Sequence, residues 1–491
     1  VYNDSKFKKA YEKLRDVYGS LGYFQWTGGT QRKPDPEKKV VDITVKMEED
    51  KQYFLGRISF TGNDSTRDKV IRREIYMNEG EVFNTEALKM SIKRVNQLGY
   101  FKPMEGAPDI RPSETAENKV DVTFKVEEQN RNQFTFGGGF SGYEGAFLNA
   151  SFSTMNFLGA GETVSVAVQT GSRTKNYSFS VSEPYFLDRP ITAGFSIYLS
   201  RITYLSYGTT VVGFGQQTQG LGLTSGISVG RFSRVFASYS YQIIDIYNVD
   251  RDTVSRLSGS TSGIGSLLTE GGSALTSLDA DYYGGTGRRF ESGISPSYVR
   301  NTVDSPFTPR AGSRYTAGFQ FGGGPLQGSV NYMRPTIELV RYQPFGRRMA
   351  LGVRGEAAYI RPFGDTTTIP YYQRYFLGGE TQIRGFNVRS VAPYDAVTKT
   401  SVGGDKFLLF NAEYYFDVFG PLRVLLFFDA GQAYAPGQGF YWRTMSTSTG
   451  VEARFIMPVL NVPFRLIYAW NPNRAFYQPP HAFKFAVGST F

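Results

Sequence analysis

The residue types that carry out most enzyme chemistry are scarce in this sequence. Its 491 residues include no Cys and one histidine, His481. Thiolate nucleophiles and disulfides are therefore excluded, and a histidine-built metal or catalytic site is not expected. The glycine run Gly137, Gly138 and Gly139 interrupts a predicted strand instead of joining a strand to a helix, so it lacks the setting of a phosphate-binding loop. We expect no enzyme activity, no cofactor and no metal site.

Two acidic residues stand in strands that are otherwise apolar at every second position. Within 407–416 the apolar side chains share one face, and Glu413 lies on the other. Within 422–434 the same parity places Asp429 opposite the apolar face. The apolar residues that fix this parity are Leu408, Phe410, Ala412, Tyr414 and Phe416 in the first strand and Leu422, Val424, Leu426 and Phe428 in the second. In a barrel that spans a membrane, both carboxylates would point into the lumen.

Alternation of this kind recurs from Phe134 to the last residue. We count sixteen segments, and the composition of 15% aromatic residues with 55 Gly suits aromatic-rich strands separated by turns. The longest tight apolar run, 424–428, is far too short for a spanning helix. We predict a mostly β fold, with a 16-stranded antiparallel transmembrane β-barrel over 131–491 and long extracellular loops at about 250–289 and 361–403. The alternative is a soluble β-sandwich, in which a second sheet would have to cover the apolar stripe.

The last strand is amphipathic and ends on an aromatic residue, a form typical of outer-membrane barrels. Its apolar face carries Phe483, Phe485, Val487 and Phe491. Closing the barrel would pair this strand with the first one, and both contain glycine, which weakens strand pairing. The predicted lateral seam comprises Phe134, Phe136, Gly137, Gly138, Gly139, Phe483, Phe485, Gly488 and Phe491.

The N-terminal third contains an internal repeat. Leu-Gly-Tyr-Phe occurs at 21–24 and again at 98–101, and the strand at 41–49 is nearly copied at 120–128. Similarity at a fixed spacing indicates repeated modules. We predict a partial module over 1–50 and a complete β-α-α-β-β module over 51–130. Because the first copy starts at its second helix, we interpret the chain as N-terminally truncated.

Within the complete module, the pattern predicts two helices between the first strand (54–60) and the closing strands. The first would begin near Asp64 or Ser65 as N-cap, with Val70, Ile71 and Ile75 as its apolar stripe. The second would begin at Thr85 and present Leu88, Ile92 and Val95 on one face. Such a module is either a small α+β domain of no special role or a scaffold whose sheet edge pairs with an extended segment.

The net charge of +10 raises the question of nucleic acid. Up to residue 131 the sequence has 24 basic and 22 acidic residues, so +8 of the excess lies in the strand-rich part. Charge spread in this way suits a polar lumen or anionic lipid headgroups at least as well as nucleic acid. We expect no nucleic-acid partner.

Several motifs resemble those of the BamA family of outer-membrane protein insertases, and the match covers essentially the whole chain. The repeats resemble its POTRA modules, 182–186 resembles the motif after its fourth barrel strand, and 301–304 resembles its turn before the ninth. The most specific segment is Phe-Leu-Gly-Gly at 376–379 followed by Ile383, Arg384, Gly385 and Phe386, which resembles the family's Val-Arg-Gly-Phe loop.

The resemblance implies that this loop folds back into the barrel, where Arg384 meets Glu413 and Asp429, which align with the family's acidic partners. Alternatively, Arg384 is an ordinary polar loop residue and the acids line a wet pore. The family further implies a bacterial outer membrane location with the N-terminal modules in the periplasm. Its partners would be unfolded outer-membrane protein substrates, accessory outer-membrane lipoproteins and outer-membrane lipid.

The function that follows from the resemblance and the glycine-containing seam is assembly of other outer-membrane β-barrels. The seam would open sideways, and its exposed edge would template the last strand of a substrate. One alternative is a POTRA-barrel exporter of a soluble passenger, of the two-partner secretion type. A simple diffusion porin is another, although a porin needs no repeats.

Overall fold

The computed structural model describes residues 3–35, 40–102, 104, 108–114, 116–129, 131–142, 144–205, 213–230, 232–248, 288–305, 308–346, 348–395, 400–419, 421–457 and 462–487. The chain divides into two compact units, Val1–Asn132 with Thr154–Thr163, and Gln133–Ser153 with Val164–Phe491. Nearly all of the predicted long loop 250–289 lies outside the described residues.

The first unit begins with a helix and a hairpin. Helix α1 (Asp4–Ser20) starts after Asn3, whose side chain accepts a hydrogen bond from the backbone N–H of Lys6 at 3.0 Å. Strands β1 (Thr27–Asp35) and β2 (Val40–Glu48) pair antiparallel. Trp26 is buried, and the Tyr11 and Tyr18 rings of α1 lie 5.6 and 5.2 Å from it, so aromatic packing joins helix and hairpin.

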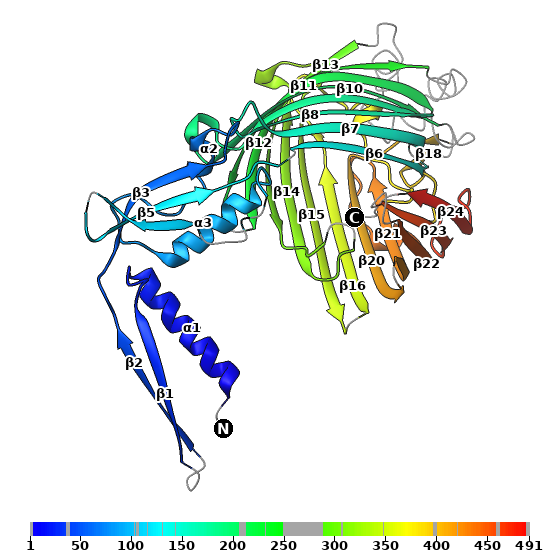
Figure 1. The fold of residues 1–491 in the computed structure, drawn as a ribbon. Coiled ribbons are helices and arrows are strands. Elements are labelled where there is room, and N and C mark those ends of the chain that lie inside the picture. Colours follow the sequence, from blue (N-terminus) through cyan, green and yellow to red (C-terminus); the bar gives the residue numbers. More distant parts are fainter. Residues whose placement is uncertain are drawn as a thin grey trace. The chain divides into compact units, whose positions relative to one another are not determined.

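The rest of the first unit is a module of the predicted β-α-α-β-β order. Its elements are β3 (Phe54–Thr61), α2 (Asp68–Arg72), α3 (Thr85–Gln97), β4 (Asp109–Pro112) and β5 (Lys119–Lys125). The sheet order is β3-β5-β4, with β3 parallel to β5 and β4 antiparallel to it. Figure 1 shows β3 and β5 side by side. Leu55, Phe83, Leu88, Val122 and Phe124 form its buried core. No helix in the described residues is long and apolar enough to cross a membrane.

Helix α2 differs from the prediction. It starts at Asp68, after Arg67, and Ile75 lies beyond its end. Arg67, the residue before the helix, has an extended backbone, which ends any helical conformation there. In the preceding turn, the carboxylate of Glu128 accepts hydrogen bonds from the backbone N–H groups of Ser65 (3.2 Å) and Thr66 (2.7 Å).

The second unit is a closed barrel of sixteen strands in its described part, as predicted, plus the two-residue β17 (Arg361–Pro362). The strands are β6 (Asn132–Ser141), β7 (Gly145–Phe157), β8 (Glu162–Gly171), β9 (Thr174–Glu183), β10 (Ile191–Tyr204), β11 (Phe214–Ser228), β12 (Ser233–Tyr247), β13 (Arg288–Asn301), β14 (Gly312–Gly322), β15 (Tyr332–Phe345), β16 (Met349–Tyr359), β20 (Lys406–Phe419), β21 (Leu422–Tyr434), β22 (Ser446–Met457), β23 (Val462–Trp470) and β24 (His481–Val487). Each follows its predecessor around the barrel, and β24 is followed by β6.

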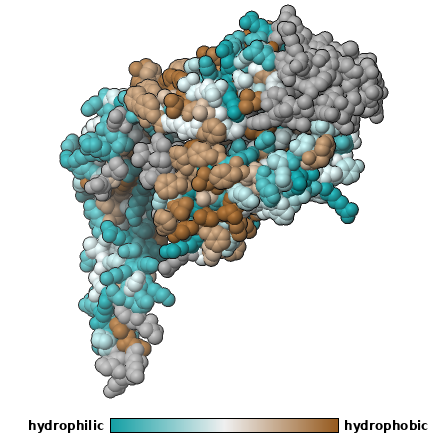
Figure 2. Space-filling view, turned by 90° about the vertical axis from the view of Figure 1, so that its right-hand side faces the viewer, coloured by the Kyte–Doolittle hydropathy of each residue, from teal (hydrophilic) through white to brown (hydrophobic). Residues whose placement is uncertain are grey.

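Alternation divides the barrel wall into an apolar outer face and an inner face. On β21, Leu426 and Phe428 are exposed, while Leu425, Phe427 and Asp429 between and beside them are buried. Figure 2 shows hydrophobic side chains gathered over the barrel on the face that it presents. A continuous apolar exterior made of alternate strand residues is the pattern of a barrel in lipid.

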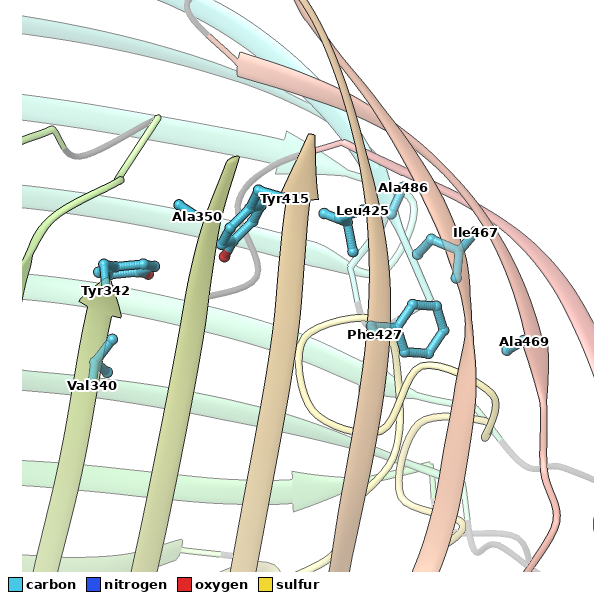
Figure 3. Packing of buried hydrophobic residues seen from close by; sticks show 9 residues of the cluster. All are labelled: Val340, Tyr342, Ala350, Tyr415, Leu425, Phe427, Ile467, Ala469 and Ala486. Atoms are coloured by element: carbon cyan, nitrogen blue, oxygen red, sulfur yellow. The ribbon is translucent and has the colours of Figure 1, made fainter. Parts of the chain in front are cut away.

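Part of the inner face is itself apolar. Nine buried residues from six strands point inward and form one cluster (Figure 3). They are Val340, Tyr342, Ala350, Tyr415, Leu425, Phe427, Ile467, Ala469 and Ala486. The lumen beside β15 to β24 is thus packed with side chains, which lowers the local dielectric around any charge placed there.

Candidate functional site

The described parts of the connection from β16 to β20 contact the inner face of the barrel wall. This loop includes the two-strand ribbon β18 (Tyr394–Asp395) and β19 (Thr400–Ser401). A tight turn precedes Arg384, in which Gly378 and Gly379 have φ of +113° and +96°, values that favour glycine. The N–H of Gly379 donates to the carbonyl of Phe386 at 3.0 Å. This turn fixes the backbone of the predicted motif 383–386.

The side chains of the motif are divided between an apolar and a polar environment. Ile383 and Phe386 are fully buried in a cluster with Leu377, Val391 and Phe407. Gly385 lies against the wall, where a Cβ would be 1.7 Å from Asn471 Oδ1 and 2.6 Å from Ser448 Oγ. Its N–H donates to Ser448 Oγ at 3.0 Å, and its carbonyl accepts from Asn471 Nδ2 at 2.9 Å. Only glycine fits this close approach.

Arg384 reaches both acidic residues that parity placed in the lumen. Its Nε and Nη2 donate to the two carboxylate oxygens of Asp429 at 2.8 and 2.6 Å, which is a bidentate contact. Its Nη1 lies 2.6 Å from Glu413 Oε1. All three side chains have no exposed surface. Arg384 therefore attaches the loop to the barrel wall in this structure. The carboxylates of Glu413 and Asp429 are not exposed to solvent.

The structure adds a third acid and two arginines that the sequence reasoning missed. Glu452 on β22 lies 3.1 Å from Arg384 Nη1. It also pairs with Arg454 Nε at 2.5 Å and Arg465 Nε at 2.6 Å, and Arg454 pairs with Glu413 at 2.7 Å. We call these six residues the lumen network: Arg384, Glu413, Asp429, Glu452, Arg454 and Arg465. The signal was available, since Glu452 alternates with Val451 on the exposed face just as Glu413 and Asp429 alternate with their apolar neighbours.

The lumen network is buried and has apolar neighbours. The Arg384 guanidinium lies 3.9 Å from the centre of the Phe427 ring, which belongs to the inward-facing apolar cluster. Removing two opposite charges from water is costly, and good geometry with several hydrogen bonds is needed to offset that cost. Here the bidentate contact of Arg384 with Asp429, and the sharing of Glu413 by Arg384 and Arg454, provide such geometry. In the described residues, no group of three or more acidic or histidine side chains is arranged to hold a metal ion.

The same loop has a second attachment, on another wall of the barrel. Glu291 of β13 is buried and accepts hydrogen bonds from Tyr372 OH at 2.8 Å and Gln373 Nε2 at 2.6 Å, both in the loop. Gln242 of β12 donates to the same carboxylate at 2.8 Å. The loop is thus attached on both sides of the lumen.

The predicted seam residues lie where the strand order closes. Strand β24 is followed by β6, and the rings of Phe140 and Phe485 are 6.4 Å apart across them. Phe134, Phe136 and Phe483 have strongly exposed side chains, as lipid-facing residues should. Gly488 and Phe491 lie outside the described residues.

The three glycines of β6 make room for strand β7. A Cβ at Gly137 would lie 2.7 Å from Asn149 Oδ1, and one at Gly139 would lie 2.6 Å from the Phe147 ring. Their contribution on the β7 side is therefore close approach, a role that the alternation pattern does not reveal.

Comparison with known proteins places these features in a family. An Omp85 superfamily domain matches residues 156–491, and a POTRA domain, described as a surface antigen variable number repeat, matches residues 53–129. The outer membrane protein assembly factor BamA of Nitratidesulfovibrio vulgaris is 26% identical over 484 residues, which are 97% of this chain and 56% of the relative. The chain therefore spans about half the length of the curated relatives that it matches.

Two solved structures share the fold. BamA from Haemophilus ducreyi lacking POTRA domains 1–3 superposes with a TM-score of 0.79 at 19% identity, over 99% of this chain and 93% of that one. CdiB from Acinetobacter baumannii gives 0.55 at 11% identity, over 97% and 79%. The resemblance to the BamA family that the motifs indicated is confirmed. The Omp85 domain covers more than half of the sequence, and this chain belongs to the Omp85 superfamily.

Proposed function

We propose that this protein assembles other β-barrel proteins into a bacterial outer membrane. Its barrel spans that membrane, and its POTRA-type modules, partial over 1–50 and complete over 51–130, extend into the periplasm. The relatives named as BamA and the barrel fold support this location and this class of activity. Unfolded outer-membrane proteins are the substrates, and accessory lipoproteins and outer-membrane lipid are the further partners.

The observation that carries the proposal is the junction of β24 and β6 beside an anchored inner loop. A barrel has no free strand edge until one junction separates. Separation here would expose the N–H and C=O groups of β6 to an incoming strand, which would gain main-chain hydrogen bonds in exchange. In this mechanism the lumen network, through Arg384, Glu413 and Asp429, keeps the wall from β20 to β22 rigid while the seam opens.

The N-terminal module contributes less edge than the sequence suggested. On the outer side of β3, Leu55 N–H donates to the carbonyl of Glu81 at 2.8 Å, and Ile58 N–H donates to Glu79 Oε1 at 2.9 Å. That edge is partly occupied. Strand β4 (Asp109–Pro112) is the other edge, and it is short and ends on proline, which limits strand addition. We therefore assign the templating of substrate strands to the barrel seam.

The test is to lock the seam in a chain that contains no native Cys. In the full-length protein, Phe140→Cys with Phe485→Cys would be oxidised to a disulfide across β6 and β24. The protein is reconstituted in liposomes, and folding of a substrate barrel is followed by its heat-modifiable migration on gels. Oxidation should stop substrate folding, and reduction should restore it.

A control is available in the same barrel. Ile243 of β12 and Phe290 of β13 lie directly opposite one another in the antiparallel register, which brings their backbones within reach of a disulfide. A disulfide between cysteines at those positions should leave substrate folding unchanged. Undiminished folding by the seam-locked protein would rule out lateral opening.

Export of a soluble passenger is the second candidate, because the CdiB structure shares the fold. The loop distinguishes the two functions. In an exporter the passenger must pass through the lumen, so the loop would have to leave its contacts with Glu291 and the lumen network. Locking the seam would not block such transport. Passenger release by the seam-locked protein would favour export.

A further inference from the structure

Glu380, in the turn before Arg384, contacts the residue that directly follows the first strand of the barrel. Its Oε2 accepts a hydrogen bond from the backbone N–H of Gly142, just after the end of β6, at 3.3 Å. A Cβ on Gly142 would lie 2.8 Å from Glu380 Oε1, which shows how closely the loop approaches this strand. The carbonyl of Gly142 accepts from Arg173 Nη1 at 2.5 Å, so that both backbone polar groups of Gly142 are hydrogen-bonded.

The same carboxylate contacts the last strand. Glu380 Oε1 lies 3.5 Å from Lys484 Nζ on β24. Lys484 also donates a hydrogen bond to the carbonyl of Phe386, in the predicted motif. Glu380 and Lys484 are largely buried, with side-chain exposures of 9% and 13%. Removing one partner of such a buried, hydrogen-bonded ion pair is strongly destabilising, because the other charge is left buried and unpaired.

A chain of contacts joins this carboxylate to the lumen network. Arg465 Nη2 donates to the backbone carbonyl of Glu380 at 3.0 Å, and Arg465 Nε binds Glu452, which in turn contacts Arg384. The position of Glu380 is therefore fixed by the residues that anchor the loop. Loop anchoring and the contacts at the two seam strands belong to one continuous network.

We propose that Glu380 is a positioning residue that bridges the end of the first barrel strand, at Gly142, to the last strand, at Lys484, and thereby holds the seam closed. The inference rests on the proposed function, in which that seam opens. Moving the loop withdraws the carboxylate from Gly142 and Lys484 together, so the loop controls when the strands separate. The exposed aromatic contact between Phe140 and Phe485 would then remain as a weaker link on the lipid side.

The experiment measures strand separation directly and independently of substrate folding. Spin labels are attached at Phe140→Cys and Phe485→Cys in the protein in liposomes. Pulsed electron paramagnetic resonance measures the distance between the labels and so gives the fraction of molecules with separated strands. Glu380→Gln and Lys484→Gln should each raise that fraction about tenfold or more. Glu356→Gln, at a lumen acid paired with Arg354 on the same strand, is the matched control and should have no effect.

Each outcome decides between the bridge and the proposed function. A larger separated fraction with altered substrate folding supports both. A larger fraction with unchanged substrate folding supports the bridge and contradicts insertion through the seam. An unchanged fraction in a folded Glu380→Gln or Lys484→Gln protein overturns the bridge, whatever the folding activity. Lys484→Gln changes the last strand and leaves the loop sequence intact. If one of the two variants fails to fold, the separated fraction of the other still tests the bridge.

Discussion

Replacing Arg384 by methionine should release the loop from the barrel wall and destabilise both. The substitution keeps much of the side-chain volume but removes four side-chain hydrogen bonds, two to Asp429, one to Glu413 and one to Glu452. The three acids are not affected equally. Glu413 and Glu452 retain Arg454, while Asp429 retains the side-chain amide of Asn411 at 2.8 Å.

The size of the effect follows from the unpaired Asp429. Breaking a fully buried pair by removing one partner costs about 3–5 kcal/mol, because the remaining charge stays in a poorly solvating environment. Since each 1.4 kcal/mol is tenfold, the released form of the loop should rise by roughly 10² to 4 × 10³. Arg384→Lys keeps the charge but not the bidentate fork, so its cost should be intermediate.

The assay is urea unfolding in detergent, followed by heat-modifiable migration for the barrel and by limited proteolysis for the loop. Adding Asp429→Asn to Arg384→Met removes the unpaired charge and should recover at least about 2 kcal/mol, a coupling that a double-mutant cycle isolates. A loss below about 1 kcal/mol in Arg384→Met, or no recovery in the double variant, would refute the electrostatic account.

Three further predictions concern the wall contact, the second loop attachment and the module. Gly385→Ala should destabilise the loop by about 1–3 kcal/mol, because its Cβ would overlap Asn471, whereas Gly355→Ala, which has open space, should be tolerated; unfolding midpoints compare them. Glu291→Leu leaves the donors of Tyr372, Gln373 and Gln242 without their acceptor and should cost about 1–3 kcal/mol, seen as faster proteolysis of the loop, while an unchanged cleavage rate would contradict the attachment. Burial raises the pKa of the Glu128 carboxyl, but hydrogen bonds from Ser65 and Thr66 outweigh burial and hold that pKa below its usual range. Its stabilising contribution is therefore complete above about pH 4.3 and is lost as pH falls through the lower folded value; amide protection factors of Ser65 and Thr66 should fall in acid, and those of Glu128→Gln should not.

Parity along single strands accounts for what the sequence could predict. Alternation alone placed Glu413 and Asp429 on the inner face, because every second residue of a strand shares a face. The same rule applied to β22 would have found Glu452. What parity cannot supply is which distant residues meet inside the barrel.

Contacts that depend on tertiary structure escaped prediction for that reason. Gly142 and Glu380 are 238 residues apart and meet only because the loop folds inward and the barrel closes. Likewise α2 starts later than its apolar stripe suggested, and the turn before it is held by Glu128, which is 62 residues from Thr66. Both contacts join residues that are too far apart in the sequence for a local pattern to predict.

The charge balance of the lumen network has a consequence for how such barrels change over evolutionary time. Three arginines and three acids form a set with no net charge in a packed interior. Losing one member leaves an unpaired charge there, so single replacements should be selected against more strongly than paired ones. Across Omp85 sequences, the positions equivalent to Glu452 and Arg465 should therefore be gained, lost or exchanged together. Correlated charges at these two positions would show that the lumen tolerates an unpaired charge poorly.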